Sequence, residues 1–337
     1  MKRILAYILG LSLVFSYAGS CFAMDESQYT IEDGFLTGSI TLDGVPLTLD
    51  ALFDDSMAMP PREVLVVPPP ITKADVMKQV EAHFNIPNDF AFQDGRAGWF
   101  YFCTLQGYYS PEYAESVKDY RQLTPHIQDD TIRKAVQQCK DFMDTLGVEY
   151  YPVPTYAVYG DIGEGPKCSP TLDPSPEPKP YVIRFANSVD GMAIDPAESG
   201  GKRGDMKIHP DRVMTNSPYT TFVFWETGEL ASLKLHTFAV AESYPVAQPL
   251  ITWQEALTIW CTRYRGEPMF IESFEDSELS VIRVQAVWLT TYNNILRPGW
   301  YIEVRGSDKD TGKPYINQDG FIPFSVLGVD AVTGDIH

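Results

Sequence analysis

The chain has 337 residues, of which 45 are acidic and 26 are basic, and its net charge is −19 at neutral pH. Such an acidic chain repels phosphate backbones and anionic lipid headgroups, which argues against binding to nucleic acids or to membranes through a basic patch. With 44% hydrophobic and 13% aromatic residues, the composition is that of a folded protein and excludes a disordered one.

The first 23 residues have the organisation of a secretory signal peptide. Lys2 and Arg3 precede an apolar run over residues 4–17, and the segment ends in Cys21-Phe22-Ala23. A basic start, a short apolar stretch and a small-x-small end are typical of a cleavable leader. We therefore predict cleavage between Ala23 and Met24, which gives a secreted, extracytoplasmic protein. The leader carries two of the 26 basic residues and none of the 45 acidic ones, so the mature charge becomes −21.

Two alternatives keep the chain attached to the outer face of the cell membrane. Cys21 follows Ala18-Gly19-Ser20, which is similar to the lipobox of bacterial lipoproteins, where the cysteine is lipidated. The large aliphatic residue that opens that box is replaced here by Ala18. An uncleaved signal anchor is the second alternative, although the apolar run is shorter than the roughly 20 residues that a spanning helix needs.

Residues 24–124 are predicted to form an N-terminal extension with one hairpin and one helix. The segment 38–50 has a strand pattern on both sides of Asp43-Gly44, which favours a hairpin. Thr72 with Asp75 three residues later forms a capping-box signature, and apolar residues follow it at helical spacing.

Residues 125–245 are predicted to form a helix followed by an antiparallel meander. From Asp130 to Leu146 the apolar residues repeat at i, i+3, i+4 and i+7, and Gly147 is the expected C-cap. Strand patterns follow over residues 148–159, 181–194, 220–225 and 230–243. The parity of the last pattern changes near Thr237, which predicts a bulge or a bend. The proline-rich stretch 160–180 is predicted to be a stiff loop inserted between strands.

Residues 246–337 repeat this plan. Thr252 and Glu255 have the same helix-start spacing as Thr72 and Asp75, and an apolar stripe runs from Trp253 to Tyr264. Strand patterns follow over residues 279–292, 300–305 and 321–332.

These elements predict an α+β fold of two helix-plus-antiparallel-meander modules preceded by an extension. The 314 residues left after cleavage exceed what one small core usually holds, which also favours two modules. In this arrangement each helix lies across one face of its own sheet.

Three short motifs resemble those of PepSY-type modules and of the paired cystatin-like modules of the YycI type. They are Ile-Thr-x-x-Glu-Ala-Leu over residues 251–257, Leu-Arg-Pro-Gly-Trp over 296–300 and Val-Asp-Ala-x-Thr-Gly-Asp over 329–335. The resemblance covers residues 246–337 best and 125–245 in outline. It implies a bacterial protein outside the cell membrane that inhibits or regulates a protease or sensor kinase by contact. YycI-type proteins keep a transmembrane anchor, whereas this leader has the pattern of a cleaved one.

Four cysteines remain after the leader. An even number outside the cell permits two disulfides, with three connectivities among Cys103, Cys139, Cys168 and Cys261. Alternatively, Cys139 and Cys261 lie on the apolar faces of predicted helices, where a free cysteine behaves as a small hydrophobic residue. No Cys-x-x-Cys pair or Cys/His cluster occurs in the sequence, so we expect no zinc site.

The sequence also predicts no catalytic residue, cofactor site or metal site. It contains no nucleophile elbow, zinc-protease helix motif, phosphate-binding loop or dinucleotide fingerprint. The five histidines have no partner at metal or triad spacing; they are His83, His126, His209, His236 and His337. Of these, His236 is expected on an exposed strand face. The many carboxylates are expected to form a solvated surface, although two of them could serve a glycoside hydrolase.

Two further patterns each leave an alternative open. Asp308 to Gly312 has the composition of a calcium loop but the wrong spacing, so we expect a hairpin loop, with a weak calcium site as the alternative. The aromatic residues concentrate at 99–102, 108–109, 150–151 and 222–225. Packing on both faces of a sheet is expected there, and an exposed stripe that binds peptide or glycan is the alternative.

These observations predict a non-enzymatic protein that regulates or inhibits a cell-envelope protein by direct contact. An extracellular protein that binds a ligand or glycan is the alternative, and an envelope hydrolase with paired carboxylates is the third hypothesis. The expected partner is an envelope protein, without nucleic acid, and with membrane attachment only through a retained or lipidated leader.

The fate of the leader is directly measurable. We predict that the intact mass of the protein isolated from its extracytoplasmic location corresponds to a chain that begins at Met24. A mass that begins at a lipidated Cys21, or that includes the whole leader, would contradict cleavage and establish a tethered protein.

Overall fold

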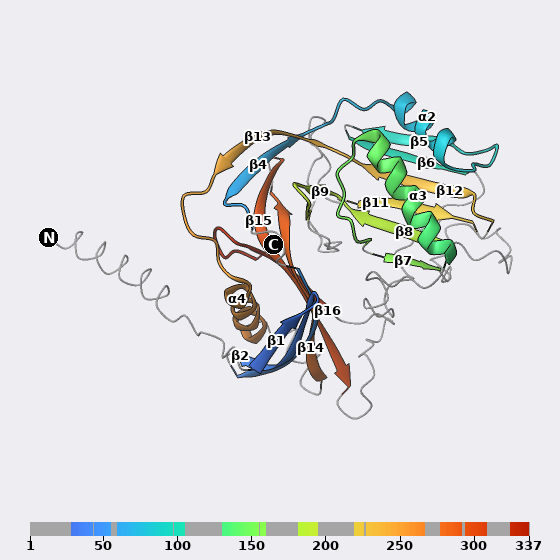
Figure 1. The fold of residues 1–337 in the computed structure, drawn as a ribbon. Helices are drawn as coiled ribbons and strands as arrows, with labels where there is room; N and C mark the ends of the chain where they lie inside the picture. Colours follow the sequence, from blue (N-terminus) through green and yellow to red (C-terminus); the bar gives the residue numbers. More distant parts are fainter. Residues whose placement is uncertain are drawn as a thin grey trace.

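The computed structural model describes residues 28–42, 44–54, 59–96, 98–104, 130–154, 156–159, 181–194, 219–225, 227–266, 277–291, 294–308 and 324–336. Over these ranges the chain is mostly β, with two large sheets and three helices (Figure 1). None of the described helices is both long enough and apolar enough to span a membrane.

The larger sheet has eight strands. It is mixed, because β14 runs parallel to β3 whereas all other strand pairs of this sheet are antiparallel. In spatial order its strands are β1 (Tyr29–Glu32), β2 (Phe35–Leu42), β3 (Val45–Asp54), β14 (Ser277–Thr290), β15 (Ile295–Asp308), β4 (Arg62–Val67) and β13 (Ala239–Pro245). The eighth strand, β16 (Phe324–Asp330), also pairs with β15. The sheet thus combines strands from both ends of the described chain.

The smaller sheet has six antiparallel strands from the middle of the chain. Its spatial order is β5 (Ala91–Arg96), β6 (Trp99–Cys103), β12 (Leu230–His236), β11 (Tyr219–Phe224), β8 (Tyr181–Ala186) and β7 (Tyr156–Tyr159). Two helices, α2 (Lys73–His83) and α3 (Asp130–Leu146), pack on one face of this sheet (Figure 1). A short hairpin of β9 (Ser188–Val189) and β10 (Met192–Ala193) follows β8.

The predicted fold of two helix-plus-meander modules is wrong. The hairpin β2–β3 belongs to the predicted extension, yet it pairs with β14 from the predicted second module. At the other end of the sheet, β4 pairs with β13, because the chain leaves the smaller sheet after β12 and enters the larger one. Hydrophobic periodicity reports which face of a strand is buried but not which distant strand lies beside it. The parallel β3–β14 pairing therefore had no local signal.

The predicted helices and the predicted hairpin are confirmed. Asp75 N–H donates to Thr72 Oγ1 at 3.2 Å, and Thr72 N–H donates back to Asp75 Oδ2 at 3.0 Å, which makes the capping box. Thr252 and Glu255 make the same reciprocal pair before α4 (Trp253–Gly266), at 3.2 and 2.7 Å. The β2–β3 register ends with Leu42 opposite Val45, so the two strands form a hairpin as expected.

Each sheet has its own hydrophobic core. The stripe of α3 is buried against the smaller sheet and the end of α2. The Phe142 ring centroid lies 5.7 Å from that of Phe222 on β11 and 5.3 Å from that of Phe84, the C-cap of α2. The stripe of α4 is buried on the larger sheet, where Trp253, Ala256, Leu257, Trp260 and Cys261 belong to the core. The indole N–H of Trp300 on β15 also donates to Ile251 O at 2.9 Å, which fixes the start of α4.

A small apolar cluster and several polar contacts join the two sheets. The cluster contains Ala186, Ala193, Tyr219, Val287, Leu289 and Tyr301, from both sheets. The Trp288 indole N–H donates to Val189 O at 3.0 Å, Arg62 forms an ion pair with Asp190, and Tyr151 Oη donates to Asp54. Burial of the phenol raises the pKa of Tyr151, and the hydrogen bond to Asp54 is the second cause of this rise.

The Tyr151 contact predicts an alkaline weakening of the fold. Because the folded-state pKa lies above the unfolded value of about 10, the stabilisation is complete below that pH and is lost as the pH rises further. We expect the urea midpoint of the wild type to fall more steeply between pH 9 and 11 than that of Tyr151→Phe. Part of the slope will persist in the variant, because burial also raises the pKa of Tyr150. Equal slopes in the two proteins would contradict the assignment.

Candidate functional site

The strand β13 forms an open edge of the larger sheet. It pairs with β4 on one side, and no described strand pairs with the other side. Residues 240–245 are all exposed. Val240 is 45% exposed and Tyr244 is 41% exposed, and they are two of the three large hydrophobic residues that are exposed in the described part of the chain. The third, Ile31, lies on β1 at the opposite edge.

The backbone direction along β13 follows from two hydrogen bonds. Val246, which directly follows β13, donates its N–H to Pro61 O at 2.8 Å, so the backbone groups of Val246 point toward β4. Val66 N–H donates to Asn294 O at 2.9 Å, so even-numbered residues of β4 face β15 instead. Because N–H and C=O alternate in direction along an antiparallel strand, both groups of Ser243 point to the open edge. Pro245 has the same direction but no N–H to offer.

The side chains of β13 present different chemistry on the two faces of the sheet. Val240 lies opposite the buried Val66, whereas Glu242 lies opposite Leu65 on the other face, after a register shift. Tyr244 shares the face of Glu242 and donates its hydroxyl to Glu242 Oε2 at 2.5 Å. This hydrogen bond raises the pKa of the exposed Tyr244 phenol.

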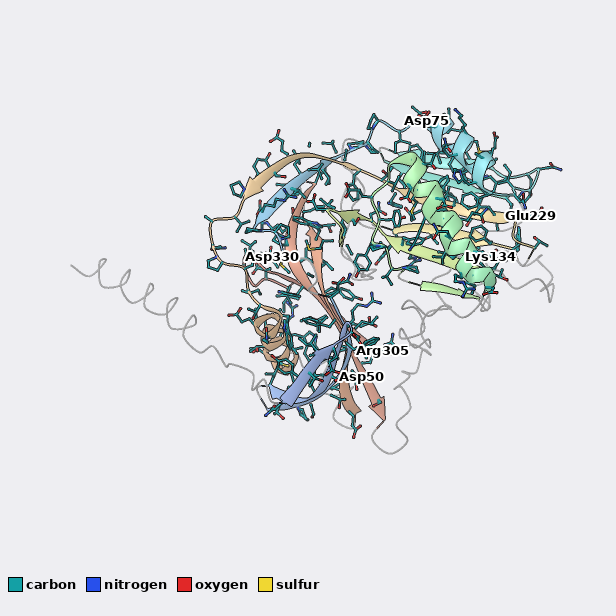
Figure 2. All side chains as sticks on the ribbon, in the orientation of Figure 1. Asp50, Asp75, Lys134, Glu229, Arg305 and Asp330 are labelled. Carbon is teal, nitrogen blue, oxygen red and sulfur yellow. The ribbon has the colours of Figure 1, made fainter. Side chains whose placement is uncertain are left out.

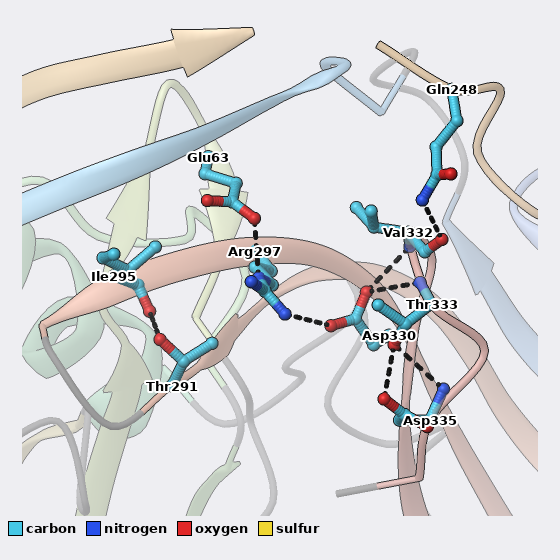
Figure 3. A network of polar contacts seen from close by, with 9 residues as sticks. All are labelled: Glu63, Gln248, Thr291, Ile295, Arg297, Asp330, Val332, Thr333 and Asp335. Carbon is cyan, nitrogen blue, oxygen red and sulfur yellow. Dashed lines mark hydrogen bonds and ion pairs between the residues drawn. The ribbon is translucent and has the colours of Figure 1, made fainter. Parts of the chain in front are cut away.

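The open edge is held to the sheet by a short contact. β4 pairs with β15 through only two residue pairs, Ile295 with Leu65 and Leu296 with Val64. Next to them Arg297 Nε lies 2.7 Å from Glu63 Oε1, and Arg297 Nη1 lies 3.4 Å from Asp330 Oδ2 (Figure 3). The guanidinium of Arg297 therefore joins β4 to β15 and to the turn that follows β16.

Asp330 is fully buried and completes this contact (Figures 2 and 3). Its Oδ1 accepts the backbone N–H groups of Val332 at 2.7 Å and Thr333 at 3.1 Å. Gly299 pairs with Asp330, and a Cβ on Gly299 would lie 2.3 Å from Leu289 Cδ1 and 2.8 Å from Val329 O. Only glycine fits at that position. The motifs at 296–300 and 329–335 thus meet in one structure, which the sequence did not reveal, while the family resemblance based on them stays a prediction.

Charged side chains are also buried on the face of β14 and β15 that points away from α4. Glu303 is 1% exposed, it lies opposite Arg283 in the β14–β15 register, and its Oε1 accepts from Arg305 Nη2 at 3.1 Å. Arg305 and Asp50 both lie on the larger sheet in Figure 2. A buried ion pair of this kind adds little net stability, because the cost of desolvating both charges offsets their attraction. The described residues contain no group of three or more potential metal ligands.

Three of the candidate disulfide cysteines are described, and all three are buried thiols. They are Cys103, Cys139 and Cys261, and no disulfide joins them. Cys139 and Cys261 pack in the two hydrophobic cores, and burial raises the pKa of the Cys139 thiol, which makes it unreactive. Cys168 and Cys21 lie outside the described residues.

The expectation for His236 is wrong, since it is 5% exposed. It ends β12, where its ring lies 6.0 Å from that of Trp99 and its carbonyl accepts from Asn187 Nδ2 at 2.6 Å. The alternating strand pattern could not reveal these contacts. His83 is part-buried, with its ring 5.9 Å from that of Phe142. His126, His209 and His337 lie outside the described residues, as do the proline-rich segment 160–180 and the calcium-loop residues after Asp308.

Most of the described aromatic residues pack within a sheet as expected. Phe100, Phe102, Phe222 and Phe224 are buried on the helix-covered face. Trp99 and Tyr101 are partly exposed on the other face, with near-parallel rings whose centroids lie 6.2 Å apart. Tyr108 and Tyr109 lie outside the described residues.

The comparisons with known proteins identify a fold and no function. No protein-family model and no curated protein matches the chain. A solved structure of an uncharacterized protein from Eubacterium rectale is similar, with a TM-score of 0.52 and 12% sequence identity over 92% of this chain and 93% of that one. Such a likeness shows the shared fold alone.

The role of Arg297 is testable by removing its charge. Arg297→Met leaves the buried Asp330 carboxylate without its cation, and we expect it to lower the free energy of unfolding by about 1–3 kcal/mol. The matched control is Arg133→Met on α3, whose ion pair with Asp130 is exposed and should contribute less than about 0.5 kcal/mol. Urea denaturation at neutral pH measures both. Equal effects of the two substitutions would contradict the role of Arg297.

Proposed function

We propose that this protein is a non-enzymatic extracytoplasmic protein that regulates or inhibits a cell-envelope protein by binding it at the open edge of β13. The observation that carries the proposal is the exposed strand itself, with the backbone of Ser243 directed outward and two large hydrophobic side chains beside it. Exposed edge strands bind extended segments by adding a strand to the sheet. The predicted leader supports a partner in the cell envelope.

The edge also carries features that limit indiscriminate pairing. The register shift between Val240 and Glu242 interrupts the ladder, and Pro245 removes one donor from the outer side. Charged residues, bulges and prolines are the usual protection of an exposed strand against aggregation. A short stretch around Ser243 remains available, which suits recognition of one segment rather than extended sheet growth.

A single substitution separates this function from the fold. Ser243→Pro removes the outward N–H without removing a bond to β4, whereas Ser243→Ala keeps the N–H. We expect affinity-tagged wild-type protein and Ser243→Ala to retain the same envelope protein from cell-envelope extract. Ser243→Pro should retain at least tenfold less of it while its thermal midpoint stays close to that of the wild type.

Equal retention by all three proteins would contradict pairing at β13.

Retention of no protein, together with binding on a glycan array, would instead favour the second candidate function, a glycan-binding protein. That candidate has one specific observation in its favour: the partly exposed pair Trp99 and Tyr101 lies on the helix-free face of the smaller sheet, next to Lys234. Trp99→Ala should then abolish the array signal.

A further inference from the structure

The charge of the open edge restricts what binds there. Glu242 is exposed near the middle of β13, and the whole chain has a net charge of −19. A strand added beside β13 would place a side chain directly opposite Glu242, with the Cβ atoms about 5 Å apart. At that separation a basic residue is attracted and an acidic residue is repelled, and the overall charge acts in the same direction during the approach.

The other face of the edge favours an apolar neighbour. Val240 is 45% exposed, although it lies opposite Val66, which is completely buried in the core of the larger sheet. An apolar side chain on the added strand would continue this hydrophobic row and cover Val240. Glu242 and Val240 occupy consecutive pairing positions, so their partners would lie on opposite faces of the added strand.

A second copy of this chain suits the edge poorly. Two copies paired antiparallel through β13 would bring two Glu242 carboxylates into one short ladder, and each copy would contribute a net charge of −19. β13 contains no basic residue that the other copy could place opposite Glu242. The acidic edge therefore calls for a partner of different composition.

We infer that the occupant of the β13 edge is a short extended segment of another protein, with a basic residue opposite Glu242 and an apolar residue opposite Val240. This inference rests on the proposed function, because it specifies the partner at the same edge. The segment is short because the outward backbone groups that can pair in full are centred on Ser243 and end at Pro245.

Two labelled peptides test the inference. They are Thr-Thr-Val-Lys-Val-Thr-Thr, in which each Val lies next to the Lys and on the opposite face of the strand, and the same peptide with Glu in place of Lys. Both have blocked ends, and fluorescence anisotropy with the full protein reports their binding. We expect the Lys peptide to bind about threefold to tenfold more tightly than the Glu peptide, with a preference that weakens as salt is added. Glu242→Lys should invert the preference, Glu242→Gln should remove it, and Ser243→Pro should weaken both peptides.

The alternative outcomes are distinct. If both peptides bind equally and Glu242→Lys changes nothing, the basic partner is wrong while pairing at β13 stands. If neither peptide binds, this inference is overturned, and the proposed function is then decided by whether Ser243→Pro loses the envelope protein. A wild-type dimer that Ser243→Pro converts to a monomer would show that a second copy occupies the edge, and would overturn the inference as well.

Discussion

The arrangement of the larger sheet depends on the position of one cation, the guanidinium of Arg297. It lies between Glu63 on β4 and the buried Asp330 at the end of β16, where the backbone pairing of β4 with β15 is only two residues long. The β4–β13 ribbon would otherwise be joined to the sheet by few hydrogen bonds. Because β13 has no other described neighbour, the contact of Arg297 also determines where the open edge lies.

A second set of contacts joins the β4–β13 ribbon to the smaller sheet. Arg62, at the start of β4, forms an ion pair with Asp190 at the tip of the β9–β10 hairpin, and Asp190 N–H donates to Glu149 Oε2 at 3.1 Å. The hairpin follows directly from the smaller sheet, and its Val189 carbonyl accepts from Trp288 of the larger one. The ribbon is therefore fixed from both sides, which leaves its outer backbone groups in a defined direction.

Sequence reasoning reached the local structure and stopped at long-range pairing. The stripe of α3, the capping boxes at Thr72 and Thr252 and the β2–β3 hairpin were predictable, because each is decided by residues close in sequence. The β3–β14 and β4–β13 pairings join residues more than 150 positions apart, and no local pattern encodes them. The same limit applies to the site. The sequence of β13 has an ordinary strand pattern, and its position at an open edge is visible only in the strand order of the folded sheet.

The central claim is that the outer backbone of β13 is open in the free protein and paired in the complex. Amide hydrogen exchange of isotope-labelled protein followed by NMR tests it most directly. The account predicts fast exchange at Ser243 and slow exchange at Glu242 and Tyr244 in the free protein, with Ser243 becoming protected when the partner binds. Slow exchange at Ser243 in the free protein, or no change there on binding, would contradict it.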